Sequence, residues 1–195
     1  MKLLLICLAL FLPTTVTAYP ATKAEKPKIS VCEVIEYVTE KHGKTDPAEV
    51  AAIASVESSM TPGVEKNGNY GLMQINCTTW ANRLRAVFGY ECRKDMLRAD
   101  RNMDAAVYIL NQYRSKYPQC RGDQAINCYH LGQSWKERQA SCSTGHGSKC
   151  SWYNESQKYL GTVLRLKKSY SRKCRVSKKE GSGVVLTPST ERTKF

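Results

Sequence analysis

The sequence of 195 residues has little that would place it in a membrane or around a metal ion. Its one long apolar run ends at residue 12, and no later run approaches the ~20 residues that a membrane-spanning helix needs, so we expect no transmembrane segment. No Cys-x-x-Cys pair occurs, and the 3 histidines do not stand at ligand spacing from the cysteines. We therefore rank a zinc site well behind disulfide bonds and expect neither metal nor cofactor.

Strand patterns and internal repeats are also missing. No stretch alternates apolar and polar residues clearly enough to predict a strand, whereas helical spacing of apolar residues is frequent. The predicted helices cover residues 31–42, residues 46 to about 58, a shorter part of 71–88, and residues 103–117, 123–130 and 152–166. The sequence therefore predicts a mostly α, single-domain fold over residues 31–170, large enough to bury a core.

Local signals define the starts of the first two helices. Ser30 and Glu33 have the spacing of a capping box ahead of the first one. Asp46 is the expected cap of the second helix, Pro47 fits its first position, and Glu49 is expected to complete a second capping box.

The N-terminus has the order of a secretory leader. Met1 and Lys2 precede a short apolar core at residues 3–12, and small residues follow up to Ala18. We predict a signal peptide over residues 1–18, cleaved after Ala18, and a linker over residues 19–30. The mature protein is then exported, to a periplasmic or extracellular location.

The chain has 9 cysteines, and cleavage of the leader removes Cys7. The others are Cys32, Cys77, Cys92, Cys120, Cys128, Cys142, Cys150 and Cys174. An even number in an exported chain indicates a disulfide framework, and eight cysteines allow 105 pairings among which the sequence does not choose. Cys142 and Cys150 are expected to pin the glycine- and serine-bearing loop that they bound.

Basic residues outnumber acidic ones, 30 to 17, which gives a formal net charge of +13. No acidic residue lies between Arg165 and Lys179. Such a segment attracts polyanions, and an exported protein meets anionic envelope polymers more often than nucleic acid, so we expect no nucleic-acid partner. The run can equally be solvated, and residues 171–195 are predicted to form a basic, disordered tail.

Glu57 is the first candidate for chemistry. Val50 and Ile53 precede it at helical spacing, which places the carboxyl on the face that the helix is expected to bury. Apolar surroundings and the negative end of a helix dipole both favour the protonated form, so its pKa should be raised, as a general acid requires. The alternative, a glutamate in solvent at a frayed helix end, stays open.

Five blocks along the chain resemble, in order, the soluble lytic transglycosylases and the related goose-type lysozymes. They are Glu57-Ser58, Asn69 to Ile75, Asp100-Arg101-Asn102 with residues 106–110, Ala125 to Gly132, and Tyr159-Leu160 with Val163-Leu164. The resemblance spans roughly residues 31–170, and the block GLMQIN is also similar to members that accompany secretion, conjugation or phage assemblies. It implies a lysozyme-like fold with a cleft for peptidoglycan glycan strands, cleaved between N-acetylmuramic acid and N-acetylglucosamine.

The resemblance also implies roles for individual residues. Glu57 matches the catalytic acid. The residues that it implies for substrate binding are Ser58, Tyr70, Gly71, Met73, Gln74, Tyr129 and Tyr159, with Tyr129 reaching toward the carboxylate. The chain departs from the family at Cys128 and His130, where alanine and asparagine are usual. Met73 can instead be a core residue, Tyr129 a structural tyrosine and His130 a surface histidine.

Only one carboxyl lies in a motif, because neither Asp123 nor Glu65 matches a catalytic position of the family. A single acid suffices when the 2-acetamido group of the substrate is the nucleophile and the 6-hydroxyl closes a 1,6-anhydro ring. We therefore predict an exported lytic transglycosylase. A muramidase that hydrolyses the same bond and a non-catalytic glycan-binding or assembly module remain the alternatives.

Overall fold

The computed structural model describes residues 27–132, 134, 136 and 151–180, without the side chains of 151–153 and 175–180. The predicted signal peptide, Cys142, Cys150 and residues 181–195 lie outside the described residues. None of the helices in the described ranges is both long and apolar enough to cross a membrane.

The first two helices are α1 (Val31–Lys41) and α2 (Pro47–Ser58). The capping box of Ser30 and Glu33 is present as predicted. Asp46 caps α2 by accepting a 3.0 Å hydrogen bond from the amide of Ala48. The predicted second capping box is wrong, because the Glu49 side chain turns into the protein and is bound by Arg114 and Lys167.

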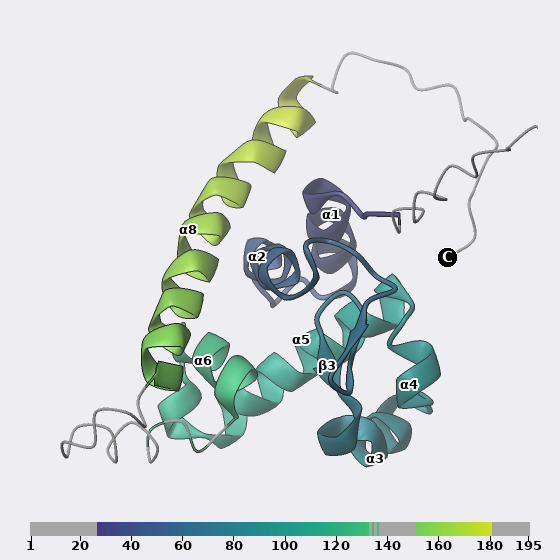
Figure 1. Ribbon diagram of the computed structural model, residues 1–195. Coiled ribbons are helices and arrows are strands. Elements are labelled where there is room, and N and C mark those ends of the chain that lie inside the picture. The colour runs from purple at the N-terminus through teal and green to yellow at the C-terminus, as the bar shows by residue number, and fades with distance from the viewer. Residues whose placement is uncertain (1–26, 133, 135, 137–150, 181–195) are drawn as a thin grey trace, which may run out of the picture.

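Helix α2 is the centre of the fold, with α1, α5 (Ala99–Lys116) and α8 (Ser151–Glu180) around it (Figure 1). Residues 48–54 are all buried, so the prediction of one buried face is too narrow. Alanines occupy four of these seven positions, and such small side chains let neighbouring helices approach from every side. A helix that is apolar all round belongs in a protein core.

A small antiparallel sheet follows α2, with strands β1 (Glu65–Lys66), β2 (Asn69–Tyr70) and β3 (Ile75–Asn76) in that order. The expectation of no strand is therefore wrong, because strands of 2 residues are too short to show alternation. The Asn67-Gly68 pair joins β1 to β2, and both residues have positive φ, 53° and 76°, as a tight hairpin turn requires.

The middle of the chain forms α3 (Cys77–Phe88), α4 (Cys92–Asp95), α5 (Ala99–Lys116), η1 (Pro118–Cys120) and α6 (Gln124–Leu131). Helix α3 begins later than the expected entry through Gly71, because residues 71–74 form a turn and β3 follows it. Asn76 caps α3 through a 2.9 Å hydrogen bond from the amide of Thr79.

Helix α8 (Ser151–Glu180) runs along one side of the molecule and packs mainly on α2 (Figure 1). It was expected to end at residue 166, and a disordered tail from 171 is wrong for residues 171–180. The Tyr170 hydroxyl lies 3.0 Å from Ser55 Oγ, and buried Cys174 is bonded to Cys32, so both hold the later turns against the body. Lysine and arginine are good helix formers, so the basic run does not oppose the helix.

Three disulfides lie in the described part of the chain, which confirms the disulfide framework: Cys32–Cys174, Cys77–Cys92 and Cys120–Cys128. The first ties α1 to the far half of α8, the second ties the start of α3 to α4, and the third ties η1 to α6. The structure is mostly α with a disulfide-stabilised core, as predicted.

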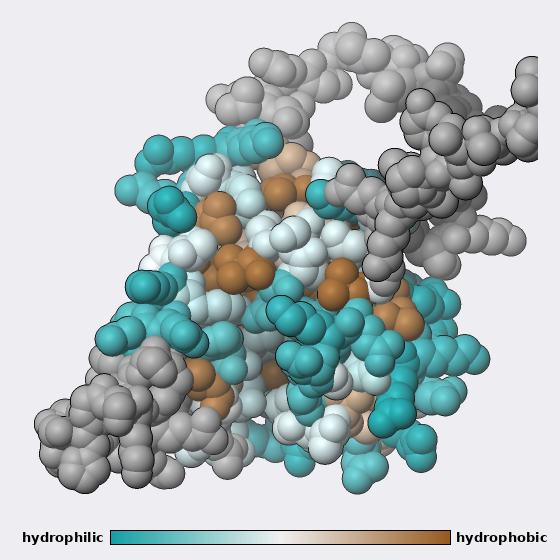
Figure 2. Space-filling view, in the orientation of Figure 1, coloured by the Kyte–Doolittle hydropathy of each residue, from teal (hydrophilic) through white to brown (hydrophobic). Residues whose placement is uncertain are grey.

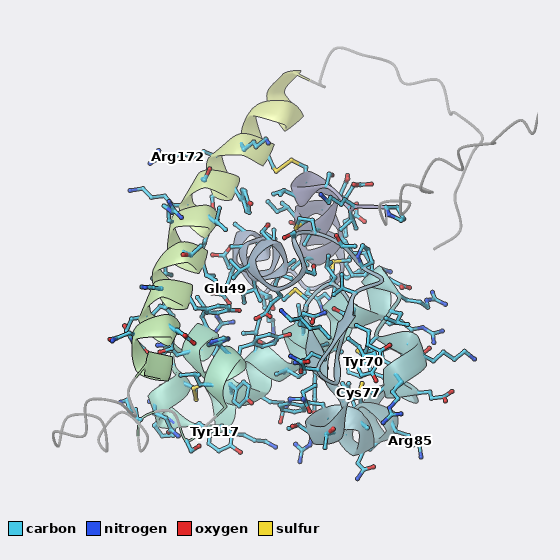
Figure 3. The ribbon with its side chains drawn as sticks, viewed as in Figure 1. Glu49, Tyr70, Cys77, Arg85, Tyr117 and Arg172 are labelled. Carbon is cyan, nitrogen blue, oxygen red and sulfur yellow. A yellow bond between two sulfur atoms is a disulfide. The ribbon has the colours of Figure 1, made fainter. Side chains whose placement is uncertain are left out.

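An ion-pair cluster around the buried Glu49 joins four parts of the fold. Glu49 is only 1% exposed and pairs with Arg114 of α5 and Lys167 of α8. Lys167 also lies 3.2 Å from Asp46 and 3.3 Å from Asp123. Figure 3 shows Glu49 on α2, on the side that faces α8. The cluster therefore fixes how α8 lies along α2.

Candidate functional site

A cleft of about 460 Å³ opens between the small sheet, α3, α5 and α6, and Glu57 at the end of α2 lies in its wall. Its lining residues among those described are Glu57, Asn69, Gln74, Ile75, Asn76, Thr79, Trp80, Ile109, Tyr113, Tyr129, His130, Leu131 and Gly132. The sequence blocks around Glu57, Gln74 and Tyr129, far apart along the chain, therefore meet at one concave surface.

Glu57 is the residue before the last one of α2 and is mostly buried. The hydroxyl of Tyr159 donates a 2.6 Å hydrogen bond to its Oε1. Burial raises the pKa of Glu57, and the hydrogen bond from Tyr159 opposes this only in part. The predicted rise in pKa is confirmed, and the alternative of a solvated, frayed glutamate is excluded.

Tyr159 and His130 form a stacked pair beside this carboxyl. Their ring centroids lie 4.1 Å apart with an interplanar angle of 11°. Burial lowers the pKa of His130, with a smaller opposing contribution from Glu155, so the imidazole is neutral at neutral pH. His130 is exposed and also lines the cleft, so it is a surface histidine that contacts the candidate site.

Tyr129 differs from the role that the resemblance implied. Its hydroxyl donates a 2.8 Å hydrogen bond to the carbonyl of Met73, not to Glu57. Burial raises the pKa of Tyr129 far above its ordinary value, and the charge of Glu57 adds to the effect. The tyrosine that binds the carboxyl is Tyr159, whereas Tyr129 holds the turn at residues 71–74 in place.

The same turn is organised by a residue that we did not single out, Asn102 on α5. Its side-chain nitrogen donates to the carbonyls of Tyr70 and Met96, at 2.9 and 2.8 Å, and its oxygen accepts from the amide of Met73 at 2.7 Å. Gly71 lies directly against it with φ 79°, and a Cβ there would meet the Met96 carbonyl oxygen at 1.8 Å. Only glycine fits this position.

Gln74 follows in the turn with φ 48°. Its Nε2 donates to the carbonyls of Gly71 and Val64, at 2.9 and 3.2 Å. These two bonds orient the amide group and leave Oε1 as an acceptor on a residue that lines the cleft. Gln74 is thus placed to accept a hydrogen bond from a ligand.

Gly71 and Tyr159 lie outside the described cleft lining, and so do three other predicted residues. Ser58 is buried, and its Oγ donates to the Ala54 carbonyl at 3.1 Å and accepts from the Thr61 amide at 3.2 Å. Met73 is fully buried in the core. The Tyr70 side chain is buried and hydrogen-bonded to Glu65. These three side chains therefore contribute to the packing behind the cleft wall and not to the described lining.

The transglycosylase SLT domain matches residues 35–151. The chain belongs to this family. Its fold is therefore the lysozyme-like one, and its family consists of enzymes that cleave glycan chains of peptidoglycan. Comparison with curated proteins and with solved structures gave no significant match.

This SLT domain has one acid in its cleft, because Glu57 is the only carboxyl among the described lining residues. Asp123 is exposed at the start of α6 and pairs with Lys167. Glu65 lies on exposed β1 and is bound to Tyr70. Neither is therefore available as a second catalytic carboxylate, and no three His, Cys, Asp or Glu of the described chain are grouped to hold a metal ion.

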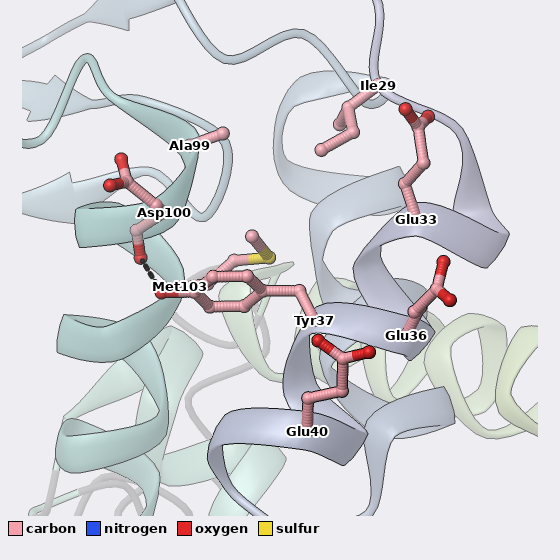
Figure 4. Close-up of a pocket in the computed structure, with 8 residues that line it drawn as sticks. All are labelled: Ile29, Glu33, Glu36, Tyr37, Glu40, Ala99, Asp100 and Met103. Carbon is pink, nitrogen blue, oxygen red and sulfur yellow. Dashed lines mark hydrogen bonds between the residues drawn. The ribbon is translucent and has the colours of Figure 1, made fainter. Parts of the chain in front are cut away.

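A second groove of the SLT domain lies between α1 and α5 (Figure 4). Its carboxyls are Glu33, Glu36, Glu40 and Asp100. Hydrogen bonds with Ser30 lower the pKa of Glu33, and Arg98 and Arg101 lower that of Asp100 although burial acts to raise it. Carboxyls held ionised, such as Glu33 and Asp100, are poor proton donors near neutral pH, whereas the raised pKa of Glu57 suits a general acid.

The cleft also contains aromatic residues that the sequence did not disclose. Trp80 on α3 and Tyr113 on α5 meet edge to face, with ring centroids 5.8 Å apart and an interplanar angle of 88°. Asn76 Nδ2 donates to Asn69 Oδ1 at 3.1 Å beside them. Trp80 is a large apolar residue directly after Thr78 and Thr79, and that contrast was the available signal.

One departure from the family has a structural cause. Cys128, at the position where the family has alanine, is bonded to Cys120 and is fully buried. The disulfide anchors α6 one residue before Tyr129 and two before His130. The cleft side chains of α6 in this SLT domain are therefore held by a covalent bond.

Proposed function

We propose that the protein is an exported lytic transglycosylase that cleaves the β-1,4 bond between N-acetylmuramic acid and N-acetylglucosamine and forms 1,6-anhydromuramic acid. The observation that carries this proposal is the single carboxyl of the cleft, Glu57, whose pKa is raised and which has no second acid beside it among the described lining residues. Two-carboxylate hydrolysis needs an acid and a partner on either side of the bond. One acid fits a reaction in which the substrate supplies the nucleophile.

In the first step Glu57 gives its proton to the glycosidic oxygen, and the bond from that oxygen to C1 of muramic acid breaks. The carbonyl oxygen of the 2-acetamido group bonds to C1 from the other face. In the second step the Glu57 carboxylate takes the proton of the 6-hydroxyl, and that oxygen bonds to C1 as the acetamido oxygen leaves. The proton returns to Glu57, and no water is consumed.

Tyr159 has a defined part in both steps. Its hydroxyl donates a hydrogen bond to Oε1 of Glu57, so Oε2 is the oxygen that delivers and takes back the proton. The same hydrogen bond stabilises the carboxylate that exists between the two steps. The neutral His130 ring stacked on Tyr159 limits how far the phenol can move.

Substrate positioning falls to the other lining residues. Trp80 and Tyr113 offer aromatic surface to sugar rings. Gln74 Oε1 has no hydrogen-bond partner among the described residues and can accept the N–H of the acetamido group, which would hold the nucleophilic carbonyl in place. Export is supported by the disulfides, which form and persist in oxidising compartments. A secretion, conjugation or phage assembly as partner stays a prediction from the resemblance alone.

Digestion of purified peptidoglycan followed by mass spectrometry tests the proposal. We expect muropeptides about 18 mass units lighter than hydrolysed ones, because ring closure replaces the addition of water. Glu57→Gln should lower turnover by at least ~10²-fold, the lower limit for loss of a general acid, whereas the matched Asp123→Asn should cost little. Products of full hydrolysed mass would assign the muramidase reaction, and an active Glu57→Gln would refute the site.

A further inference from the structure

The outer side of α8 carries a row of cations that the proposed chemistry does not use. Arg165, Lys168, Ser169, Arg172 and Lys173 line a shallow hollow there. They stand at spacings of three, four, seven and eight residues from Arg165, so they follow one side of the helix over ~12 Å. We call these five residues the basic stripe. All five are exposed, and Figure 3 shows Arg172 pointing away from the body of the protein.

Lys167, in the same part of α8, differs from the cations of the basic stripe because it has a structural role. It lies between the carboxylates of Asp46, Glu49 and Asp123, at 3.2, 3.3 and 3.3 Å. The four cations of the basic stripe have no ion-pair partner among the described residues. The described side chains of α8 contain one acid, Glu155, ten residues before Arg165. The positive charge of the stripe is therefore left for an external anion.

The residues of the basic stripe and of the rest of α8 indicate which kind of anionic partner the stripe can bind. A helix that inserts into a membrane interface presents large apolar side chains beside its cations. On α8 the apolar residues Tyr159, Val163 and Cys174 are instead buried in the protein. The stripe also contains no aromatic residue on which the bases of a single-stranded nucleic acid would stack. A row of point charges fits a linear polymer with repeated phosphate groups.

We propose that the basic stripe binds a linear, phosphate-bearing polymer attached to peptidoglycan and so holds the enzyme on its substrate. This rests on the proposed function, because such a polymer lies beside the glycan strand that the cleft would cleave. Arg165 follows Tyr159 by six residues, ~9 Å along the same helix. One helix thus presents Tyr159 to Glu57 on its inner side and cations to the polymer on its outer side.

The test measures sedimentation of the protein with insoluble peptidoglycan in a Glu57→Gln background, so that the substrate stays intact. One sample keeps its phosphate polymer and a second has lost it by hydrofluoric acid treatment. The stripe variant is Arg165→Gln, Lys168→Gln, Arg172→Gln and Lys173→Gln. A matched control, Lys41→Gln, Lys44→Gln, Arg85→Gln and Arg93→Gln, removes the same charge from other exposed sites.

We expect the stripe variant to bind phosphate-bearing peptidoglycan at least ~4-fold more weakly at low salt, since each exposed ion pair contributes roughly 1.4- to 5-fold. The control should lose much less, and the difference should shrink as salt screens the charges. On stripped peptidoglycan the two variants should bind alike. A second variant, Lys168→Glu with Arg172→Glu, should repeat the loss.

Three outcomes would overturn the proposal: equal binding by the stripe variant and the control, an equal loss on stripped peptidoglycan, or stripe-dependent binding to anionic vesicles or DNA alone. Turnover of short neutral glycan fragments by the stripe variant with Glu57 intact should be unchanged. An enzyme with no turnover at all would refute the proposed function without altering the binding comparison. The two proposals therefore fail separately.

Discussion

Tyr159→Phe tests the hydrogen bond on which the proposed acid depends. The change removes the hydroxyl that donates to Glu57 Oε1 at 2.6 Å and keeps the ring that stacks on His130. A hydrogen bond to a charged group contributes roughly 1.5–3 kcal/mol, and one pKa unit corresponds to about 1.4 kcal/mol. Loss of this bond, which acts to lower the pKa of Glu57, should therefore raise that pKa further.

The sign of this change can be read from the pH dependence of kcat/KM. Glu57 must be protonated to act, so activity falls at high pH as it ionises. In Tyr159→Phe the alkaline limb should move to higher pH, while the maximal rate falls because the carboxylate between the two steps is less stabilised. The matched control is Tyr37→Phe, which removes a 2.9 Å tyrosine–carboxylate bond to Asp104 away from the cleft. An alkaline limb that stays in place or moves down would refute the reasoning.

Three further predictions concern the stability of the fold: the burial of Glu57, the backbone at Gly71 and the Cys120–Cys128 disulfide. Because burial raises the pKa of Glu57, its protonated form stabilises the fold at low pH, and this contribution is lost as pH rises through the folded-state pKa. The glutamine of Glu57→Gln does not ionise. In thermal melts the midpoint of this variant should therefore rise relative to that of the unmodified protein between about pH 4 and pH 8. Gly71→Ala should lower the free energy of unfolding in urea by at least ~2 kcal/mol, because the new Cβ would meet a main-chain carbonyl oxygen at 1.8 Å. Gly68 has φ 76° and nothing within 4 Å of its Cβ position, so Gly68→Ala should lower it by only ~1 kcal/mol. Equal losses for the two variants would contradict the steric argument. Replacing Cys120 and Cys128 together by alanine removes a disulfide that closes a loop with a sequence separation of 8. The free energy of unfolding should fall by ~2–3 kcal/mol. A thermal midpoint, followed by circular dichroism, that does not shift would exclude a stabilising role of this disulfide.

The sequence predicted those helices whose ends are set by local chemistry. Ser30 and Glu33 cap α1 through bonds within one turn, and Asp46 with Pro47 starts α2 in the same local way. Glu49 has the correct spacing for a capping box, yet it pairs with Arg114, 65 residues away. Such a long-range partner cannot be inferred from neighbouring residues.

The same limit applies to the candidate site. Glu57 and the rise in its pKa could be predicted, since an acid within an apolar run at a helix end is a local pattern. The exchange of roles between Tyr129 and Tyr159 could not, because it depends on how α6 and α8 pack against α2. Trp80 was missed for a similar reason, since it lies in the cleft only because β3 ends where α3 begins.

The hydrogen bond from Tyr159 to Glu57 joins residues 102 positions apart, and the Cys32–Cys174 bond beyond it closes a separation of 142. As the chain emerges from the ribosome, the acid is made long before its partner. A nascent protein that has folded only as far as α6 has Glu57 but not the phenol that positions it. The site therefore becomes complete late, after α8 has docked, and oxidation of Cys32 and Cys174 then secures this helix covalently.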